Sequence, residues 1–211
     1  MLVEDHASFR KALAFVLNRE PEFEVVAQAG SLAEARQALE EIDMAVVDLA
    51  LPDGNGAEFI HDLYRYNPGT RVLVLSATLD PSSFALMIEA GAGGVLDKLA
   101  GLHAIVGALR RLEAGGAMPQ QEEVVRLLRL FSEQPDPSRG TPTAVESLTP
   151  RESEVLQALA EGLDSEGIVK KLSITTEEEQ ASVSSILDKL GARSRLHALA
   201  IAARQGTVEI R

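Results

Sequence analysis

The sequence predicts an α/β protein, with a doubly wound parallel sheet followed by a small all-α domain. Short apolar runs alternate with helical patterns five times in the first half of the chain. Such alternation is typical of a parallel sheet with helices on both faces, and right-handed crossovers close it as a doubly wound sheet. From residue 146 onward the pattern is helical throughout.

The expected strands are short apolar runs bounded by polar residues or glycine. They are Leu2–Val3, 23–28, Met44–Asp48, Arg71–Ser76 and Gly94–Asp97. Helical spacing predicts helices over 8–18, 32–40, 57–66, Pro81–Ala90 and 102–114. The second of these helices begins at a capping box, Ser31 with Glu34. Only three residues precede Glu4, so either the first strand is truncated or the true start lies upstream.

The middle of the chain has the composition of a linker. An amphipathic helix is expected over 120–133, and three prolines and a glycine follow before residue 143. We therefore divide the chain into a first domain over 1–117, a linker over 118–145 and a second domain over 146–211. In the second domain, caps and apolar spacing predict four short helices that form a bundle.

The composition excludes several kinds of site. The chain has no cysteine, which excludes disulfides, thiolate metal sites and cysteine nucleophiles. No apolar run approaches the roughly 20 residues of a membrane helix, and Met1-Leu2-Val3-Glu4-Asp5 does not begin a signal peptide. A soluble cytoplasmic protein without a membrane partner is expected. The net charge of −12 disfavours nucleic-acid binding, which usually needs a basic surface.

Acidic side chains end two of the expected strands. Glu4 and Asp5 end the first strand, and Asp48 ends the third. Ligands of doubly wound sheets bind at the carboxyl ends of strands, where the strand order reverses, so these carboxylates should crowd into one pocket. Their mutual repulsion favours a hard divalent cation, and Mg²⁺ prefers oxygen ligands.

Polar residues end two further strands. Ser76 ends the fourth strand, and Lys98 follows the fifth, where it can pair with a carboxylate or a phosphoryl oxygen. With Mg²⁺, these groups would neutralise charge on a transferring phosphoryl group, and Asp48 would be its nucleophile. A lone aspartate at a strand end is usually a turn or cap residue, so the ordered set of strand ends carries this interpretation.

Residues 2–117 resemble the receiver domain of bacterial two-component response regulators. The matching motifs are Leu2-Val3-Glu4-Asp5-His6, Asp48-Leu49-Ala50-Leu51-Pro52-Asp53-Gly54-Asn55-Gly56, Leu75-Ser76-Ala77 and Leu96-Asp97-Lys98. The resemblance implies a flavodoxin-like fold with strand order 2-1-3-4-5.

The same resemblance assigns a role to each residue of the pocket. It implies that a sensor histidine kinase phosphorylates Asp48, and that Ser76 and Lys98 sense the phosphoryl group. The implied ligands of Mg²⁺ are Glu4, Asp5, Asp48 and the carbonyl of Ala50. One residue departs from the family: Val95 stands where Tyr or Phe is usual, and it cannot make the same inward rotation.

Residues 148–206 resemble the LuxR-type helix-turn-helix domain of the NarL/FixJ group. The matching motifs are Leu148-Thr149-Pro150-Arg151-Glu152-Ser153-Glu154-Val155-Leu156, Ala160-Glu161-Gly162 and Ile186-Leu187-Asp188-Lys189-Leu190-Gly191-Ala192-Arg193-Ser194-Arg195. The resemblance implies that the third helix of this domain enters the major groove of DNA. It also implies a dimer contact through the last helix, so a homodimer is expected.

The expected recognition helix is unusually acidic. Glu177, Glu178 and Glu179 replace a basic, a hydroxyl and an apolar residue of the family. Residues 146–211 hold eight basic and eleven acidic residues, a net charge of −3. These glutamates also suit a helix start, because carboxylates favour the first turn and Thr175 forms a capping box with Glu178.

Two functions therefore stay open for this helix. In the first, phosphorylation controls DNA binding and transcription, with base contacts from Thr176, Gln180, Ala181 and Ser184. The expected phosphate contacts are Lys170, Lys171, Lys189, Arg193 and Arg195. In the second, DNA binding is lost, and the acidic helix binds a basic protein surface or holds the receiver closed.

An enzyme is the third interpretation, and we do not expect one. Phosphatases with an aspartyl nucleophile need a second aspartate two residues on, where this chain has Ala50. The four histidines, His6, His61, His103 and His197, lie far apart in sequence and suggest no metal site or catalytic triad. Slow self-hydrolysis of the phosphoaspartate is the only expected chemistry.

Overall fold

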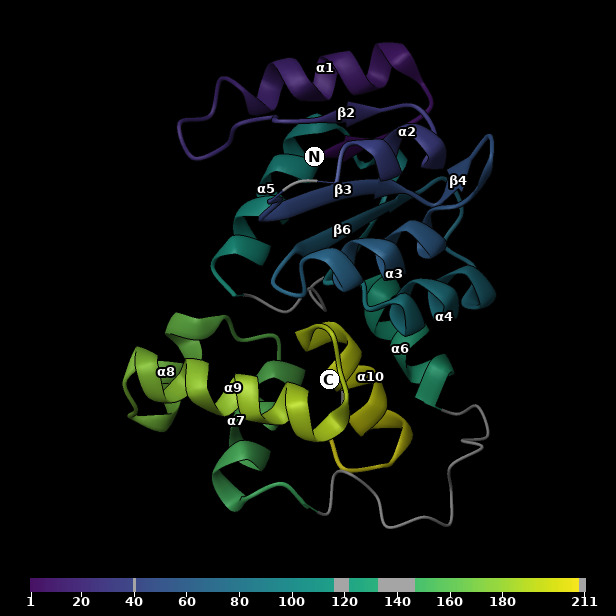
Figure 1. Cartoon of the computed structure of the whole chain (residues 1–211). Coiled ribbons are helices and arrows are strands. Elements are labelled where there is room, and N and C mark those ends of the chain that lie inside the picture. The colour runs from purple at the N-terminus through teal and green to yellow at the C-terminus, as the bar shows by residue number, and fades with distance from the viewer. Residues whose placement is uncertain (40, 116–121, 133–146, 209–211) are drawn as a thin grey trace.

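The computed structural model describes residues 1–39, 41–115, 122–132 and 147–208. Its first domain is a parallel five-stranded sheet between two layers of helices (Figure 1). The strands are β1 (Leu2–Val3), β2 (Gln28–Ala29), β3 (Met44–Asp48), β6 (Arg71–Ser76) and β7 (Gly94–Asp97). Their order is β2-β1-β3-β6-β7, which confirms the predicted doubly wound topology.

Helices cover both faces of this sheet, because successive strand residues point to opposite sides. Leu73 and Leu75 of β6 pack in the layer of α1 (Ala7–Leu17) and α5 (Leu102–Glu113). Val72 and Val74 pack against the opposite layer. That layer contains α2 (Leu32–Gln37), α3 (Gly56–Tyr66) and α4 (Pro81–Ala90). Burial on both faces explains why the strands are nearly continuous apolar runs.

Three details of the first domain differ from the expectation. The strand predicted over 23–28 is wrong over most of its length, because only Gln28–Ala29 pairs with β1. Because β1 has only two residues, β2 at the edge of the sheet can pair over no more than two residues. Helix α2 ends at Gln37 rather than at residue 40, which lies outside the described residues. A short hairpin, β4 (Ala50–Leu51) with β5 (Gly54–Asn55), and a 3₁₀ turn over Lys98–Ala100 were not predicted.

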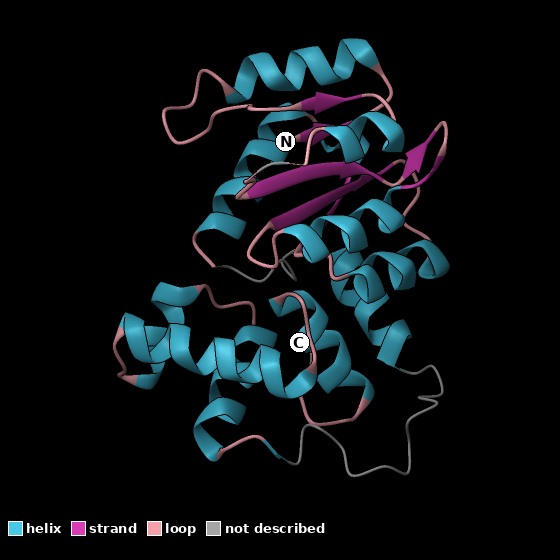
Figure 2. Ribbon diagram, in the orientation of Figure 1, coloured by secondary structure: helices cyan, strands magenta, loops and turns pink. Residues whose placement is uncertain are grey.

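The second domain is a bundle of helices (Figure 2). These are α7 (Pro150–Ala160), α8 (Ser165–Leu172), α9 (Thr176–Leu190) and α10 (Arg195–Arg204), as predicted. Capping boxes begin α7 at Thr149 and α9 at Thr175. The buried core is aliphatic, with Val155, Leu156, Leu159, Ile168, Val183, Ile186 and Leu199 among its members.

The two domains are packed against each other along α4. Helix α6 (Glu122–Ser132) and α10 both contact it, and they lie side by side in Figure 1. Phe131 of α6, with Leu196 and Ala200 of α10, is buried in the same cluster as Phe84 of α4. The linker helix was expected over 120–133; residues 120, 121 and 133 lie outside the described residues. Among the described helices, none has the length and apolar character required to cross a bilayer.

Candidate functional site

The carboxyl ends of β1, β3 and β7 bring two carboxylates and an ammonium together. Lys98 Nζ donates to Asp48 Oδ2 at 2.6 Å and to Glu4 Oε1 at 2.8 Å. Glu4 is 2% exposed and Asp48 is 3% exposed, so these charges meet out of water. Burial alone would lower the pKa of Lys98, but the hydrogen bonds to Asp48 and Glu4 raise it overall, so the lysine is charged.

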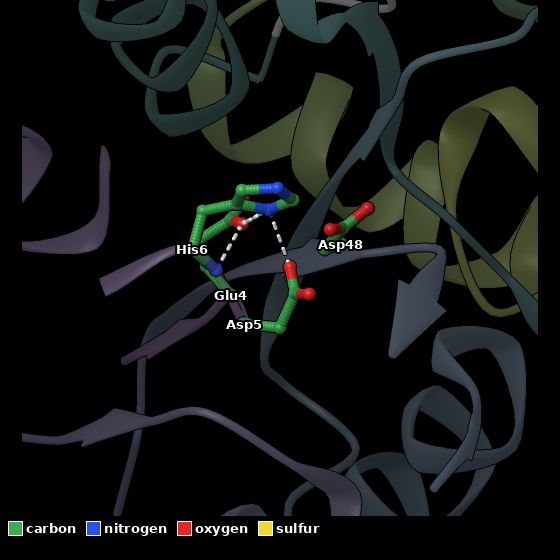
Figure 3. Close-up of side chains that lie close together, drawn as sticks. All are labelled: Glu4, Asp5, His6 and Asp48. Carbon is green, nitrogen blue, oxygen red and sulfur yellow. Dashed lines mark hydrogen bonds and ion pairs between the residues drawn. The ribbon is translucent and has the colours of Figure 1, made fainter. Parts of the chain in front are cut away.

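The pocket has the composition of a site for a hard cation. Ligand atoms of Glu4, Asp5, His6 and Asp48 all lie within 4.8 Å of one another (Figure 3). Glu4 Oε2 is buried and has no hydrogen-bond partner in the described structure. A buried carboxylate oxygen without a donor is costly, and a divalent cation would satisfy it. The residues present therefore fit Mg²⁺.

His6 lies at the edge of this pocket, although the sequence analysis assigned it no role there. Its Nδ1 is 2.6 Å from Asp5 Oδ1 and 3.1 Å from Glu4 Oε1, and hydrogen bonding to Asp5 raises the pKa of His6. Desolvation raises the pKa of Asp5, but hydrogen bonding with Glu4 and His6 lowers it overall. The only signal in the sequence for a position of His6 at the pocket was that it directly follows Glu4 and Asp5.

Ser76 and Ala50 lie at the same edge of the sheet, whereas Val95 lies in the core. Ser76 Oγ donates to Thr78 O at 2.6 Å, so its hydroxyl bonds its own loop rather than Asp48. The backbone N–H of Ala50 donates to Asp48 Oδ1 at 3.3 Å. Val95 is fully buried. A Cβ on Gly56 would lie 2.1 Å from the carbonyl oxygen of Asp48, so only glycine allows α3 to start this close to the pocket.

The four residues predicted to contact bases share one exposed face of α9. They are Thr176, Gln180, Ala181 and Ser184. The three glutamates of this helix have different surroundings. Glu177 is exposed, and Glu178 accepts from the backbone N–H of Thr175 as part of the capping box. Glu179 is 0% exposed and points inward.

A buried ion pair replaces the apolar contact expected at Glu179. Arg195 Nη1 donates to Glu179 Oε1 at 2.9 Å, and Ser165 Oγ lies 3.3 Å from the same oxygen. This contact joins the first turn of α9 to the first turn of α10. The outer face of α9 therefore carries fewer acidic groups than the sequence suggests.

Four of the five basic residues predicted to contact phosphates already bind other groups. Lys189 pairs with Glu152 at 2.7 Å, Lys171 pairs with Glu161, and Arg195 pairs with Glu179. Desolvation raises the pKa of Glu152, but Lys189, Ser185 and Thr149 outweigh it and lower this pKa to about 2. Arg193 contacts the first domain. Lys170 is exposed, and no ion pair holds it among the described residues.

Comparison with known families covers both domains. The family of response regulator receiver domains matches residues 1–110, and the LuxR family of bacterial regulatory proteins matches residues 146–202. The chain belongs to the response regulators that join a receiver to a LuxR-type DNA-binding domain. These two matches agree with the pocket at the sheet edge and with the helical bundle that follows it.

Relatives match this response regulator along most of its length. The DNA-binding transcriptional activator DevR/DosR of Mycobacterium tuberculosis is 34% identical, over 95% of this chain and 92% of the relative. The nitrate/nitrite response regulator NarP of Escherichia coli is 30% identical, over 94% and 91%. The solved RcsB response regulator of Salmonella typhimurium has a TM-score of 0.54 and 23% identity, with 94% of each chain covered, and shares the fold.

The domains of the regulator are joined by contacts that sequence reasoning missed. Arg193 Nη1 donates to the carbonyl oxygen of Ala90 at 3.3 Å and contacts Nδ1 of His61, while its guanidinium lies 5.9 Å from the centre of the Tyr64 ring. Ser194 Oγ donates to the carbonyl oxygen of Ala92 at 2.7 Å. No local pattern marks such contacts, because their partners are about 100 residues away.

We expect His197 to make the stability of the regulator depend on pH. Burial, with the charge of Arg193, lowers the pKa of His197 to about 4, and its Nδ1 lies 3.3 Å from the Arg193 backbone N–H that donates to it. The unfolded chain has a histidine pKa near 6.5 and binds this proton first. The contribution of neutral His197 to the free energy of unfolding is therefore complete above about pH 6.5. It is lost as the pH falls toward 4, which lowers the free energy of unfolding by at most about 3 kcal/mol.

Urea unfolding at pH 7.5 and pH 5 checks this expectation. The His197→Gln variant, which keeps an acceptor, should lose part of the pH dependence. The His103→Gln variant changes an exposed histidine and should keep all of it. If wild type and His197→Gln lose equal stability at pH 5, the assignment to His197 is wrong.

Proposed function

We propose that Asp48 accepts a phosphoryl group from a sensor histidine kinase and thereby controls DNA binding and transcription in the cytoplasm. The observation that carries this proposal is the contact of Lys98 with both Asp48 and Glu4, beside a carboxylate oxygen of Glu4 that has no donor. Residues 1–117 would be the receiver, 118–145 the linker and 146–211 the DNA-binding domain.

Mg²⁺ would be held by Glu4, Asp5, Asp48 and the carbonyl of Ala50, and its charge would neutralise the phosphoryl oxygens. An Asp48 carboxylate oxygen would attack phosphorus while the bond from phosphorus to the donor breaks, which gives an acyl phosphate. Lys98 would keep its charge and move from the carboxylates to a phosphoryl oxygen. Ser76 would have to leave Thr78 to donate to the same group.

Labelling with acetyl phosphate and Mg²⁺ tests the receiver. Wild type should take up one phosphoryl group, and Asp48→Asn should take up none, because an amide oxygen is not the required nucleophile. Removal of Mg²⁺ by EDTA should reduce labelling to the level of Asp48→Asn. Asp53→Asn is the control and should be labelled as well as wild type, because the Asp53 carboxylate accepts from the backbone N–H groups of Leu32 and Ala33 at the start of α2. Equal labelling of Asp48→Asn and wild type would contradict the assignment.

Contacts from α9 would read DNA. Thr176, Gln180, Ala181 and Ser184 form its exposed face, and Gln180 has the donor and acceptor needed to pair with adenine. Lys170 would contact a phosphate directly, and Lys171, Lys189, Arg193 and Arg195 would do so only after giving up their present partners. The name of the 34% identical relative, a DNA-binding transcriptional activator, supports this function.

The docked domains favour a second possibility, autoinhibition. Leu196 and Ala200 of α10 are buried against the receiver, so the face that would join two copies as a homodimer is covered. Phosphorylation would shift an existing equilibrium toward the undocked form rather than create it. The exposed face of α9 is not part of this contact.

A gel-shift titration over salt separates retained from lost DNA binding. Lys170→Ala should weaken binding to all sequences and reduce the salt dependence by about one unit of slope, because one phosphate contact is lost. Gln180→Ala should cost about 1–3 kcal/mol on the preferred site only. Absence of binding at low salt, with or without the phosphoryl group, would leave only the protein-interaction function of the acidic helix.

A further inference from the structure

A cavity of about 250 Å³ lies between the two domains. One wall comes from the end of α3, the start of β6 and the end of α5. The other wall comes from α9 and from the residues that begin α10. Because each domain supplies one wall, the cavity exists only while the domains are docked.

The charge of this cavity is opposite to that of the chain. Arg71, Arg193 and Arg195 line it, and no aspartate or glutamate does, although the chain carries a net charge of −12. Arg195 is balanced by Glu179. Among the described residues, Arg71 and Arg193 form no ion pair with a carboxylate, and Arg193 bonds a carbonyl and a histidine. Arg71 also borders a neighbouring hollow whose lining includes Glu22, Glu24, Glu41, Asp43 and Glu113, none of them within ion-pair distance of it. The cavity is therefore bordered by two guanidinium groups without a carboxylate bound to either.

The remaining walls combine apolar side chains with the polar Thr70 and Ser194. Leu112 of the receiver faces Val183 and Leu187 of α9 across the cavity, and the ring of Tyr64 closes one side. The Tyr64 hydroxyl is already used, because it donates to the carbonyl oxygen of Gly91 at 2.7 Å. The cavity therefore combines cationic donors with hydrocarbon walls. Small-molecule sites likewise combine apolar walls with convergent polar groups.

We propose that this cavity binds a small organic monocarboxylate with a compact aromatic or branched body. Arg71 and Arg193 would bind the carboxylate by charge-assisted hydrogen bonds, and Leu112, Val183 and Leu187 would enclose the body. A ligand that needs both domains stabilises the docked form, so it opposes the release of α10. This inference does not depend on phosphorylation of Asp48.

Calorimetric titration of the full chain in the Asp48→Asn background tests the site with benzoate as the probe. Benzoate should bind with a Kd of about 1 mM or below, a range typical of ligands of this size. Benzamide, which has no charge, and acetate, which has no ring, should each bind at least tenfold more weakly. Equal binding of benzamide would overturn the role of the arginines, and equal binding of acetate would overturn the role of the apolar walls.

Variants place the binding in the cavity. Arg71→Gln should weaken benzoate at least tenfold, and Arg111→Gln, a matched exposed arginine of α5 that does not line the cavity, should not. Benzoate should also slow amide hydrogen exchange in α10 of the Asp48→Asn protein. It should not do so when Arg71→Gln is added. The proposal fails if benzoate does not bind, if Arg71→Gln binds it as well as Arg71 does, or if exchange in α10 is unchanged by saturating benzoate.

Discussion

Replacing Arg195 with methionine will lower the free energy of unfolding of the DNA-binding domain by about 3–5 kcal/mol. The substitution removes the guanidinium from Glu179, which is 0% exposed, and leaves a buried carboxylate with only Ser165 beside it. Glu179 Oε2 already lacks a hydrogen-bond partner, so no further donor is at hand to replace the guanidinium. Hydrogen exchange of the α9 amides during urea titration measures the loss in this domain alone.

Two further variants separate the buried pair from a general effect of charge. Arg151→Met breaks an exposed pair with Glu154 and an exposed hydrogen bond to the carbonyl oxygen of Leu172, and should cost at most about 1 kcal/mol. The double variant Glu179→Val with Arg195→Met replaces the pair by apolar groups and should regain most of the lost stability. A loss below about 1 kcal/mol in Arg195→Met would mean that the pair does not hold α9 to α10.

Introducing a carboxylate at Ala200 will separate the two domains. Ala200 is fully buried in the apolar cluster that α10 shares with α4 of the receiver and with α6, so Ala200→Glu places an unpaired charge in this contact at a cost of several kcal/mol. Separation of the two domains is the change that relieves this charge at the smallest cost in free energy, because it leaves the core of each domain intact. Small-angle scattering should show a larger radius of gyration, and α4 amides should lose protection against exchange.

The undocked variant reports on docking alone, because the face of α10 that carries Ala200 would also join two copies as a homodimer, and a carboxylate there would disturb both contacts. Ala12→Glu makes the same chemical change on the exposed side of α1 and should not alter the radius of gyration. An unchanged radius of gyration in Ala200→Glu would contradict the docked arrangement in solution.

The sequence predicted the receiver pocket because its residues follow strand ends in order. Topology alone then brings Glu4, Asp48 and Lys98 together, and the structure has them in contact. The hydroxyl of Ser76 was predicted to face the same pocket, but which way a short side chain turns depends on a loop that no pattern specifies. The strand expected over 23–28 failed for a related reason, since the length of an edge strand depends on its neighbour.

The second domain gives the opposite lesson at Glu179. All three glutamates were interpreted as residues of the helix start or of an acidic outer face, and Glu179 is instead buried. A signal for this was present but not used, because Glu179 lies four residues before the buried Val183 and seven before the buried Ile186. The partner, Arg195, could not be found this way, since it comes from another helix. The same limit applies to Arg193, whose partners belong to the other domain.

The acceptors at the domain contact are main-chain atoms. Arg193 and Ser194 bind the carbonyl oxygens of Ala90 and Ala92, which every amino acid carries. Between them, Gly91 has φ +98, and a Cβ there would lie 2.7 Å from Cβ of Arg193. The hydrogen bonds across the contact therefore do not depend on the side-chain chemistry of residues 90 and 92, although both side chains are buried and must stay small. A receiver chosen for a chimera with this DNA-binding domain should keep glycine at 91, small residues at 90 and 92, and the apolar face of α4.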